Sequence, residues 1–125
     1  MKPPTKPTTK TVGDQGESRA LRYLTTQGLS VVHRNYRTPG RGGGEIDLIM
    51  QSPDGTLVFV EVRARSSLDY GGAAASIGHV KRRRAIFAAQ HFLLRYGAKL
   101  PPCRFDVIAL DGDQLEWIQA AFDAS

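Results

Sequence analysis

The stretch Leu57–Arg65 reads LVFVEVRAR, and it begins as a run of apolar and β-branched residues suited to the interior of a sheet. Glu61 and Arg63 interrupt this run two residues apart, so in a strand they lie on the same face. Burying a charged side chain is costly unless the charge is paired or bound to another group. The stretch therefore predicts a buried strand whose acid and base need partners.

A second strand-like run, EIDLIM at Glu45–Met50, precedes this stretch and is separated from it by QSPDG, which has strong turn chemistry. The two runs are predicted to form a hairpin. If the turn is centred on Asp54, Asp47 lies directly across from Glu61. This pairing depends on the assumed register, because a slip of one residue moves every side chain to the other face.

Two opposed acids need an explanation, because directly paired side chains have Cβ atoms about 4.5–5.5 Å apart. Either one carboxyl is protonated with a raised pKa, or a cation lies between Asp47 and Glu61. Mg²⁺ is a hard ion that suits such oxygen ligands. The same register places Glu45 opposite Arg63 as an ordinary ion pair. The competing interpretation is that these acids are solvated residues on an exposed face.

A helix is predicted at Asp14–Gln27, because Asp14 and Glu17 have the spacing of a capping box and Gly28 suits the position after the last turn. Glu17 also precedes the apolar positions of this helix by three and four residues, so it is expected to point roughly along the buried face. Capping alone gives Glu17 an ordinary role. A third acid near the core strengthens the metal-site interpretation.

The remaining segments predict an α/β domain with a mixed sheet flanked by helices, in the order α-β-β-β-α-β-β. A first strand at Leu29–Tyr36 leads into a flexible turn, TPGRGGG. The later elements are a helix from Ser76 to Tyr96, a strand at Cys103–Leu110, and a strand or short helix at Gln114–Phe122.

The composition predicts one domain with an anionic partner. The chain has 125 residues, with 17 Lys and Arg against 12 Asp and Glu, and a net charge of +5. Residues 1–12 are expected to form a disordered basic tail in front of a single domain at 13–122. No stretch is apolar enough to cross a membrane, and the single Cys103 excludes an internal disulfide framework. These features favour a cytoplasmic protein without a membrane partner.

A cluster of basic residues, HVKRRR at His79–Arg84, opens the second predicted helix. Successive cations cannot all face one way on a helix, so at least one is expected to point elsewhere. A solvated basic face is the competing interpretation. Phosphate contacts would give salt-dependent affinity with little sequence information, and no strand with interleaved aromatics predicts base stacking. The candidate nucleic-acid-binding residues are Arg37, Arg41, Arg65, Lys81, Arg82 and Arg83.

The chain also resembles a known family, the YraN-like family of small bacterial proteins. The resemblance rests on GDQGESRALRYL, NYR, GGGEIDLIM, LVFVEVRARS, GGAAAS and RFDVIAL, and it runs from about Val12 to Leu110. GEIDLI followed by FVEVR is the most specific part. That family is predicted to be nuclease-like, with a restriction-endonuclease-like fold similar to that of archaeal Holliday-junction resolvases.

The resemblance implies a site in which an acid of the first helix joins an Asp and a Glu-x-Lys motif on adjacent strands. The matching catalytic positions are Glu17, Asp47, Glu61 and Arg63. Asp47, Glu61 and the backbone carbonyl of Val62 would bind Mg²⁺ or Mn²⁺, with Glu17 acting directly or through water. The implied activity is endonucleolytic cleavage of branched or structured DNA, read through its backbone. Resolvases act as symmetric pairs, so a homodimer is compatible with the resemblance.

One position departs from the superfamily pattern, which has lysine where this chain has Arg63. Arginine stays charged, so Arg63 cannot act as a general base. It could still hold the attacking water or stabilise charge on the phosphate. This departure favours the alternative function, a non-catalytic module on a nuclease scaffold that binds nucleic acid or recruits a partner.

Overall fold

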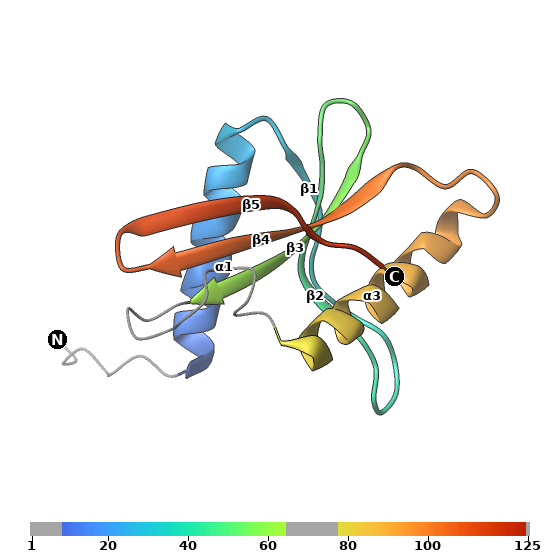
Figure 1. Cartoon of the computed structure of the whole chain (residues 1–125), viewed down its shortest axis with the longest axis horizontal. Helices are drawn as coiled ribbons and strands as arrows, with labels where there is room; N and C mark the ends of the chain where they lie inside the picture. Colours follow the sequence, from blue (N-terminus) through green and yellow to red (C-terminus); the bar gives the residue numbers. More distant parts are fainter. Residues whose placement is uncertain (1–8, 65–77, 125) are drawn as a thin grey trace, which may run out of the picture.

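The computed structural model describes residues 9–64 and 78–124, and it has the element order expected from the sequence (Figure 1). The segment after Asp111, for which the sequence allowed a strand or a short helix, is a strand. Within the described ranges the elements are α1 (Thr9–Thr26), β1 (Ser30–Arg37), β2 (Glu45–Gln51), β3 (Leu57–Ala64), α3 (His79–Leu93), η1 (Leu94–Tyr96), β4 (Cys103–Asp111) and β5 (Gln114–Phe122).

The strands form one mixed sheet in the order β1-β2-β3-β4-β5. Neighbouring strands are antiparallel except for β3 and β4, which run parallel along their whole length. Parallel neighbours need a crossover connection, and α3 lies between β3 and β4 in the chain. The expected α/β class, with a mixed sheet flanked by helices, is confirmed. No helix in the described part of the chain is long and apolar enough to cross a membrane.

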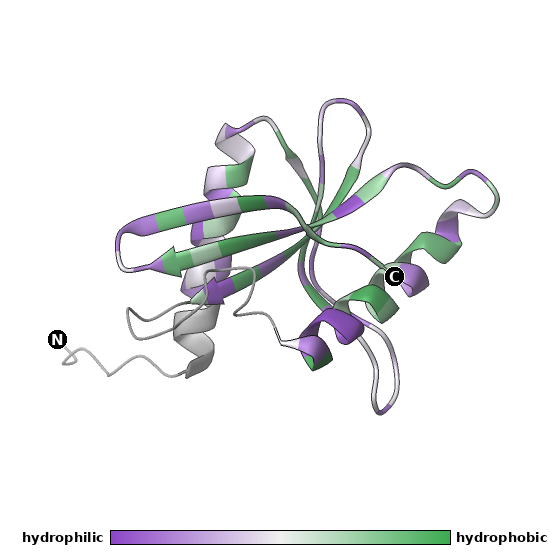
Figure 2. Ribbon diagram, in the orientation of Figure 1, coloured by the Kyte–Doolittle hydropathy of each residue, from purple (hydrophilic) through white to green (hydrophobic). Residues whose placement is uncertain are grey.

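The two helices cover opposite faces of the sheet (Figure 1). On α1 the buried residues Ala20 and Leu24 contact the alternate strand residues that face them. On α3 the small residues Ala85, Ala88 and Ala89 allow close approach to the other face. Figure 2 shows hydrophobic residues along β3 and β4 and hydrophilic residues in the first turns of α3. The acid-bearing strand β3 is therefore central and covered on both faces.

Alternation along the hairpin places side chains on the two faces as expected, with one exception. Leu48, Val58 and Val60 lie in the α1 cluster, whereas Phe59 lies in the α3 cluster. Regular alternation would place Ile46 on the same face as Leu48, but Ile46 lies in the α3 cluster. Strand β2 therefore departs from regular alternation just before its pairing with β3 begins.

The first helix begins at Thr9, five residues before the predicted start. Asp14 lies inside the helix, so the prediction that it is the N-cap is wrong. The helix Thr9–Thr26 contains no proline, and proline is the residue that most strongly prevents a helix from extending. The predicted start of the second helix, at Ser76, lies outside the described residues.

The glycine-rich loop between β1 and β2 is tied at its base and pressed against α3. The Gly44 N–H donates to Thr38 Oγ1 at 2.6 Å, and the Thr38 N–H donates to the Gly44 carbonyl at 3.0 Å. A Cβ atom on Gly44 would lie 2.3 Å from the Arg84 carbonyl oxygen, so only glycine fits here without a shift. The loop thus fixes the start of β2 against the first turns of α3.

Candidate metal site and basic groove

The hairpin has the predicted register. Leu48 pairs with Val60 and Gln51 with Leu57, so the turn is centred on Asp54. The Asp54 carboxylate closes the turn by accepting from the Thr56 N–H at 3.0 Å and from the Ser52 hydroxyl. Extending this register by one residue brings Asp47 across from Glu61.

The structure brings Asp47 and Glu61 together at the end of the paired ladder. Asp47 Oδ2 accepts a hydrogen bond from the Val62 N–H at 2.8 Å, so the carboxyl of one strand is held against the backbone of the next. The Glu61 side chain is 1% exposed, and neither of its oxygens has a hydrogen-bond partner among the described residues. Glu61 is therefore a buried acid whose oxygens accept no hydrogen bond in the described structure, whereas buried polar groups ordinarily have such partners.

Burial raises the pKa of the Glu61 carboxyl well above its ordinary value, and the neighbouring negative charge of Asp47 raises it further. The Lys81 ammonium opposes both effects. The net direction is upward, so the protonated form of Glu61 persists to a higher pH than that of an exposed glutamate. A divalent cation would reverse this shift, because it stabilises the carboxylate form.

Lys81 is a member of the site that the sequence placed elsewhere. It was expected among the phosphate-binding residues, but its Nζ lies 3.6 Å from Glu61 Oε2 and 4.0 Å from Asp47 Oδ2. The signal that could have found it was the run of four cations, of which at least one had to point away from the others. The structure shows that Lys81 turns from the basic face toward the carboxyl pair.

The other predicted catalytic residues, Glu17 and Arg63, lie on α1 and on β3. Glu17 is half-buried, and the preceding Gly16 lies against Val62 and Leu110, which places this turn of α1 over β3 and β4. Arg63 is half-buried two residues beyond Glu61, and its Nε has no hydrogen-bond partner within the described ranges.

The predicted ion pair between Glu45 and Arg63 is replaced by a pair on the other side of β2. Glu45 Oε2 lies 3.7 Å from Arg37 Nε, its partner across the β1–β2 ladder. Both side chains are largely exposed, so this contact contributes little to stability. The prediction failed because β2 has a neighbour on each edge, whereas the sequence argument considered only the hairpin with β3.

The carboxyl pair has the chemistry of a divalent-cation site. Glu61 offers two oxygens that no hydrogen bond occupies in the described part of the molecule, and Asp47 uses only Oδ2 for its contact with the Val62 N–H. Two carboxylates with completing waters suit Mg²⁺. Among the described residues, no three His, Cys, Asp or Glu side chains gather closely enough to hold a metal ion. The candidate carboxylate ligands within the described residues are therefore Asp47 and Glu61.

A second buried acid, Asp106 on β4, has a complete set of partners. It accepts from Arg104 Nε at 3.1 Å, from Trp117 Nε1 at 2.9 Å and from the Ala120 N–H at 2.9 Å. These contacts join β4 to β5, so the role of Asp106 is structural.

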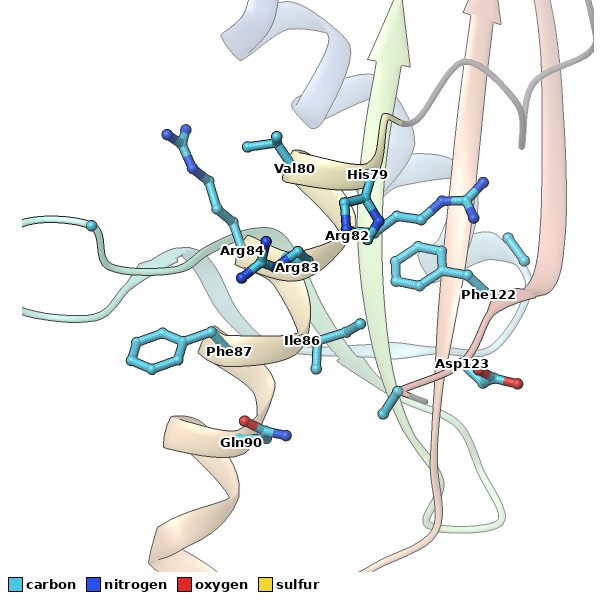
Figure 3. Close-up of a pocket in the computed structure, with 13 residues that line it drawn as sticks. His79, Val80, Arg82, Arg83, Arg84, Ile86, Phe87, Gln90, Phe122 and Asp123 are labelled. Carbon is cyan, nitrogen blue, oxygen red and sulfur yellow. The ribbon is translucent and has the colours of Figure 1, made fainter.

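The remaining basic residues of α3 line a groove between this helix and the C-terminal end of β5 (Figure 3). Arg82 lies with its guanidinium 5.6 Å from the centre of the Phe122 ring. Arg83 and Arg84 are exposed and line the same groove. Arg37 and Arg41 are exposed beside the glycine-rich loop, and the predicted Arg65 lies outside the described residues.

Comparison with known proteins places these residues in a family. The description of the matching family is Uncharacterised protein family UPF0102, and the match covers residues 16–110. A UPF0102 protein of Acidovorax sp. (strain JS42) is 62% identical over 94% of this chain and 89% of its own length. Similar proteins include those of Paracidovorax citrulli, 61% identical over 95% and 87%, and Methylibium petroleiphilum, 56% identical over 94% and 98% of the two chains. The matched segment contains the carboxyl pair and Lys81.

Proposed function

The chain belongs to the uncharacterised protein family UPF0102, and we propose that it is a Mg²⁺- or Mn²⁺-dependent endonuclease acting on branched or structured DNA. The observation that carries the proposal is Glu61, a buried acid with two oxygens that accept no hydrogen bond in the described structure, next to Asp47. A stably folded protein without a ligand for such a group would gain by replacing it. A cation site gives the acid a use.

Each residue of the site has a role that follows from its chemistry. Asp47 and Glu61 would hold the metal with the Val62 carbonyl, and Glu17 would contribute through water. A bound Mg²⁺ would lower the pKa of a water ligand and offset charge on the phosphate. Asp47 is already oriented for this by the Val62 N–H, which fixes one of its oxygens.

The two cations beside the carboxyl pair would act on the phosphate. Lys81 is 36% exposed and lies on the helix that opens next to the acids, so its ammonium can reach a phosphate oxygen as well as Glu61. Arg63 stays charged and would orient the phosphate or the attacking water. The exposed Arg37, Arg41 and Arg83 and the half-buried Arg82 would bind the backbone of the DNA, and the enzyme would act in the cytoplasm.

The proposal is tested by the Asp47→Ala variant. Labelled junction, flap, duplex and single-stranded DNAs are incubated with pure protein and Mg²⁺ or Mn²⁺. The wild type is expected to cut one class of branched substrate only when metal is present, and Asp47→Ala is expected to fall to background. Asp111→Ala, which removes an exposed acid at the end of β4, is the matched control and should cleave like the wild type. Equal cleavage by Asp47→Ala would refute the proposal.

A second candidate function, a non-catalytic nucleic-acid-binding module, is favoured by the position of Lys81. Its ammonium already offsets the charge of the carboxyl pair, which a metal-free scaffold requires. The two functions differ in a thermal melt with and without millimolar Mg²⁺. The enzyme should melt at a higher temperature with metal, and Lys81→Met should keep that shift. A non-catalytic module should show no shift while it still binds DNA.

The oligomeric state is a further part of the proposal. An enzyme that resolves a four-way junction must cut two strands, and a symmetric homodimer would present two carboxyl pairs for this. Sedimentation with and without junction DNA measures it. A dimer on the junction supports this part of the proposal, whereas a monomer on the cleaved junction contradicts it.

A further inference from the structure

The groove between α3 and the C-terminal end of β5 combines positive charge with exposed apolar surface. It has a volume of about 790 Å³, within the range of ligand sites, which runs from roughly 300 to 1,000 Å³. Arginines and His79 gather at one end and Gln90 lies at the other, with Phe87 and Phe122 on either side of Ile86 (Figure 3). The groove thus has a cationic end, an apolar middle and an amide end.

Two apolar residues of the groove, Val80 and Phe87, are exposed, whereas Ile86 and Phe122 pack against the core. Phe87 is 51% exposed and Val80 is 62% exposed, although both lie on a helix whose other side is packed on the sheet. Phe87 follows Arg83 by four residues and Arg84 by three, so the three share one face of the helix. An exposed aromatic ring beside two guanidinium groups suits a ligand with both a flat ring and a negative charge.

The charge at the groove favours a nucleic acid over other flat ligands. Three arginines line it, and Asp123 is the acid that lines it within the described residues. Arg82 stacks on Phe122, which leaves Arg83 and Arg84 as exposed cations for a phosphate. Lys81, on the same turn of α3, reaches the carboxyl pair. The first turns of this helix therefore connect the groove to the proposed metal site.

We propose that this groove binds one unpaired nucleotide of a nucleic-acid strand, with the base stacked on Phe87 and its phosphate on Arg83 and Arg84. Gln90 would contact the base edge from the far end of the groove. The inference rests on the proposed function for its choice of ligand, and it adds a preference for DNA with single-stranded segments. Stacking on an aromatic ring tolerates any base, because every base has a flat face.

The test measures binding without turnover, so it is separate from the test of the metal site. A fluorescent oligothymidylate and a duplex of the same length are titrated with protein in EDTA, and anisotropy gives the dissociation constants. Phe87→Ala is expected to weaken oligothymidylate binding about tenfold and duplex binding by less than twofold. Phe87→Trp should restore it. Leu94→Ala, which removes another exposed apolar side chain outside the groove, is the matched control.

Salt dependence tests the phosphate contact. Arg83→Ala should lower the slope of log affinity against log salt by about 0.7 on the oligothymidylate. Asp111→Ala should bind oligothymidylate like the wild type, and this readout is independent of whether the protein cleaves DNA. Equal weakening of oligothymidylate and duplex by Phe87→Ala would overturn the inference, as would a result within twofold of Leu94→Ala. Equally tight binding of an acidic peptide through the same residues would also overturn it.

Discussion

Two acids buried on adjacent central strands, Asp106 and Glu61, differ in their partners. Asp106 is 0% exposed and is contacted by a guanidinium, an indole N–H and a backbone N–H. Glu61 is 1% exposed, its oxygens accept no hydrogen bond in the described structure, and the Lys81 ammonium lies 3.6 Å from Oε2. Burial is the same for both. What separates them is whether the fold supplies hydrogen bonds to the carboxyl oxygens.

The difference indicates which acid serves the fold and which is available to a ligand. A carboxylate with a full set of donors stabilises the segments that supply them, here β4 and β5. A carboxylate without donors destabilises its own surroundings unless a ligand binds it. Burial and residue type alone would assign both acids to the same role. The donors distinguish them.

The largest expected effect comes from removing the acid with the full set of partners. Asp106→Ala leaves Arg104, Trp117 Nε1 and the Ala120 N–H without their acceptor. Breaking a buried charged pair in this way costs about 3–5 kcal/mol of unfolding free energy. Urea denaturation measures it, with the exposed Asp111→Ala as control, expected within about 0.5 kcal/mol of the wild type. A loss below 1 kcal/mol would remove the contrast between the two acids.

The second expected effect is an increase in the free energy of unfolding, and its size depends on pH. The pKa of Glu61 is raised in the folded state, so its contribution to stability is full below the ordinary value near 4.5 and is lost as the pH rises through the folded pKa. Glu61→Gln has no such loss. In metal-free buffer at pH 8 it should be about 1–2 kcal/mol more stable than the wild type, and the gap should close toward pH 4. The checks are urea melts at both pH values in EDTA.

Added Mg²⁺ tests the same comparison between the wild type and Glu61→Gln. With millimolar Mg²⁺ the wild type should gain stability at pH 8, because a ligand that binds only the folded state stabilises it. Glu61→Gln should gain less, since an amide is a weaker ligand than a carboxylate. A variant that is less stable than the wild type at pH 8 in EDTA would show that Glu61 is a structural acid like Asp106.

The smallest expected effect concerns Asp54, an exposed acid whose carboxylate accepts two hydrogen bonds. The Ser52 hydroxyl and the Thr56 N–H lower the pKa of Asp54 to about 2. Its contribution is therefore present above the ordinary value of 3.8 and is lost as the pH falls toward 2. Asp54→Asn should lower the melting temperature slightly at pH 6, and the difference from the wild type should vanish near pH 2. A constant difference across this range would contradict the assignment.

The fold was predictable because its signals are local. Period-two alternation identified the hairpin, and the turn around Asp54 set a register that the structure confirms. The start of α1 was predicted wrongly, because Asp14 and Glu17 have capping-box spacing while lying inside a longer helix. Spacing alone does not show where a helix begins. The face of α3 that packs on the sheet was also hidden, since alanines form it while Phe87 stays exposed.

The site was predictable where it depended on one hairpin and not where it depended on tertiary contacts. The approach of Asp47 to Glu61 follows from register. The contact of Lys81 with both acids depends on how α3 crosses the sheet, which no local pattern specifies. The Arg37–Glu45 pair required knowing that β1 lies beside β2. The partners of Asp106 likewise come from a strand that follows it in the chain.

The glycine-rich loop has a consequence for protein engineering. Gly44 lies against the Arg84 carbonyl at the start of β2. A Cβ on Gly40 or Gly42, in contrast, would meet no atom within 4 Å. A dye attached to a cysteine that replaces the exposed Arg41 would therefore lie on the open loop next to Gly42, which lines the groove. With the exposed Cys103 replaced by serine, a single dye at position 41 would report occupancy of the groove without touching the carboxyl pair.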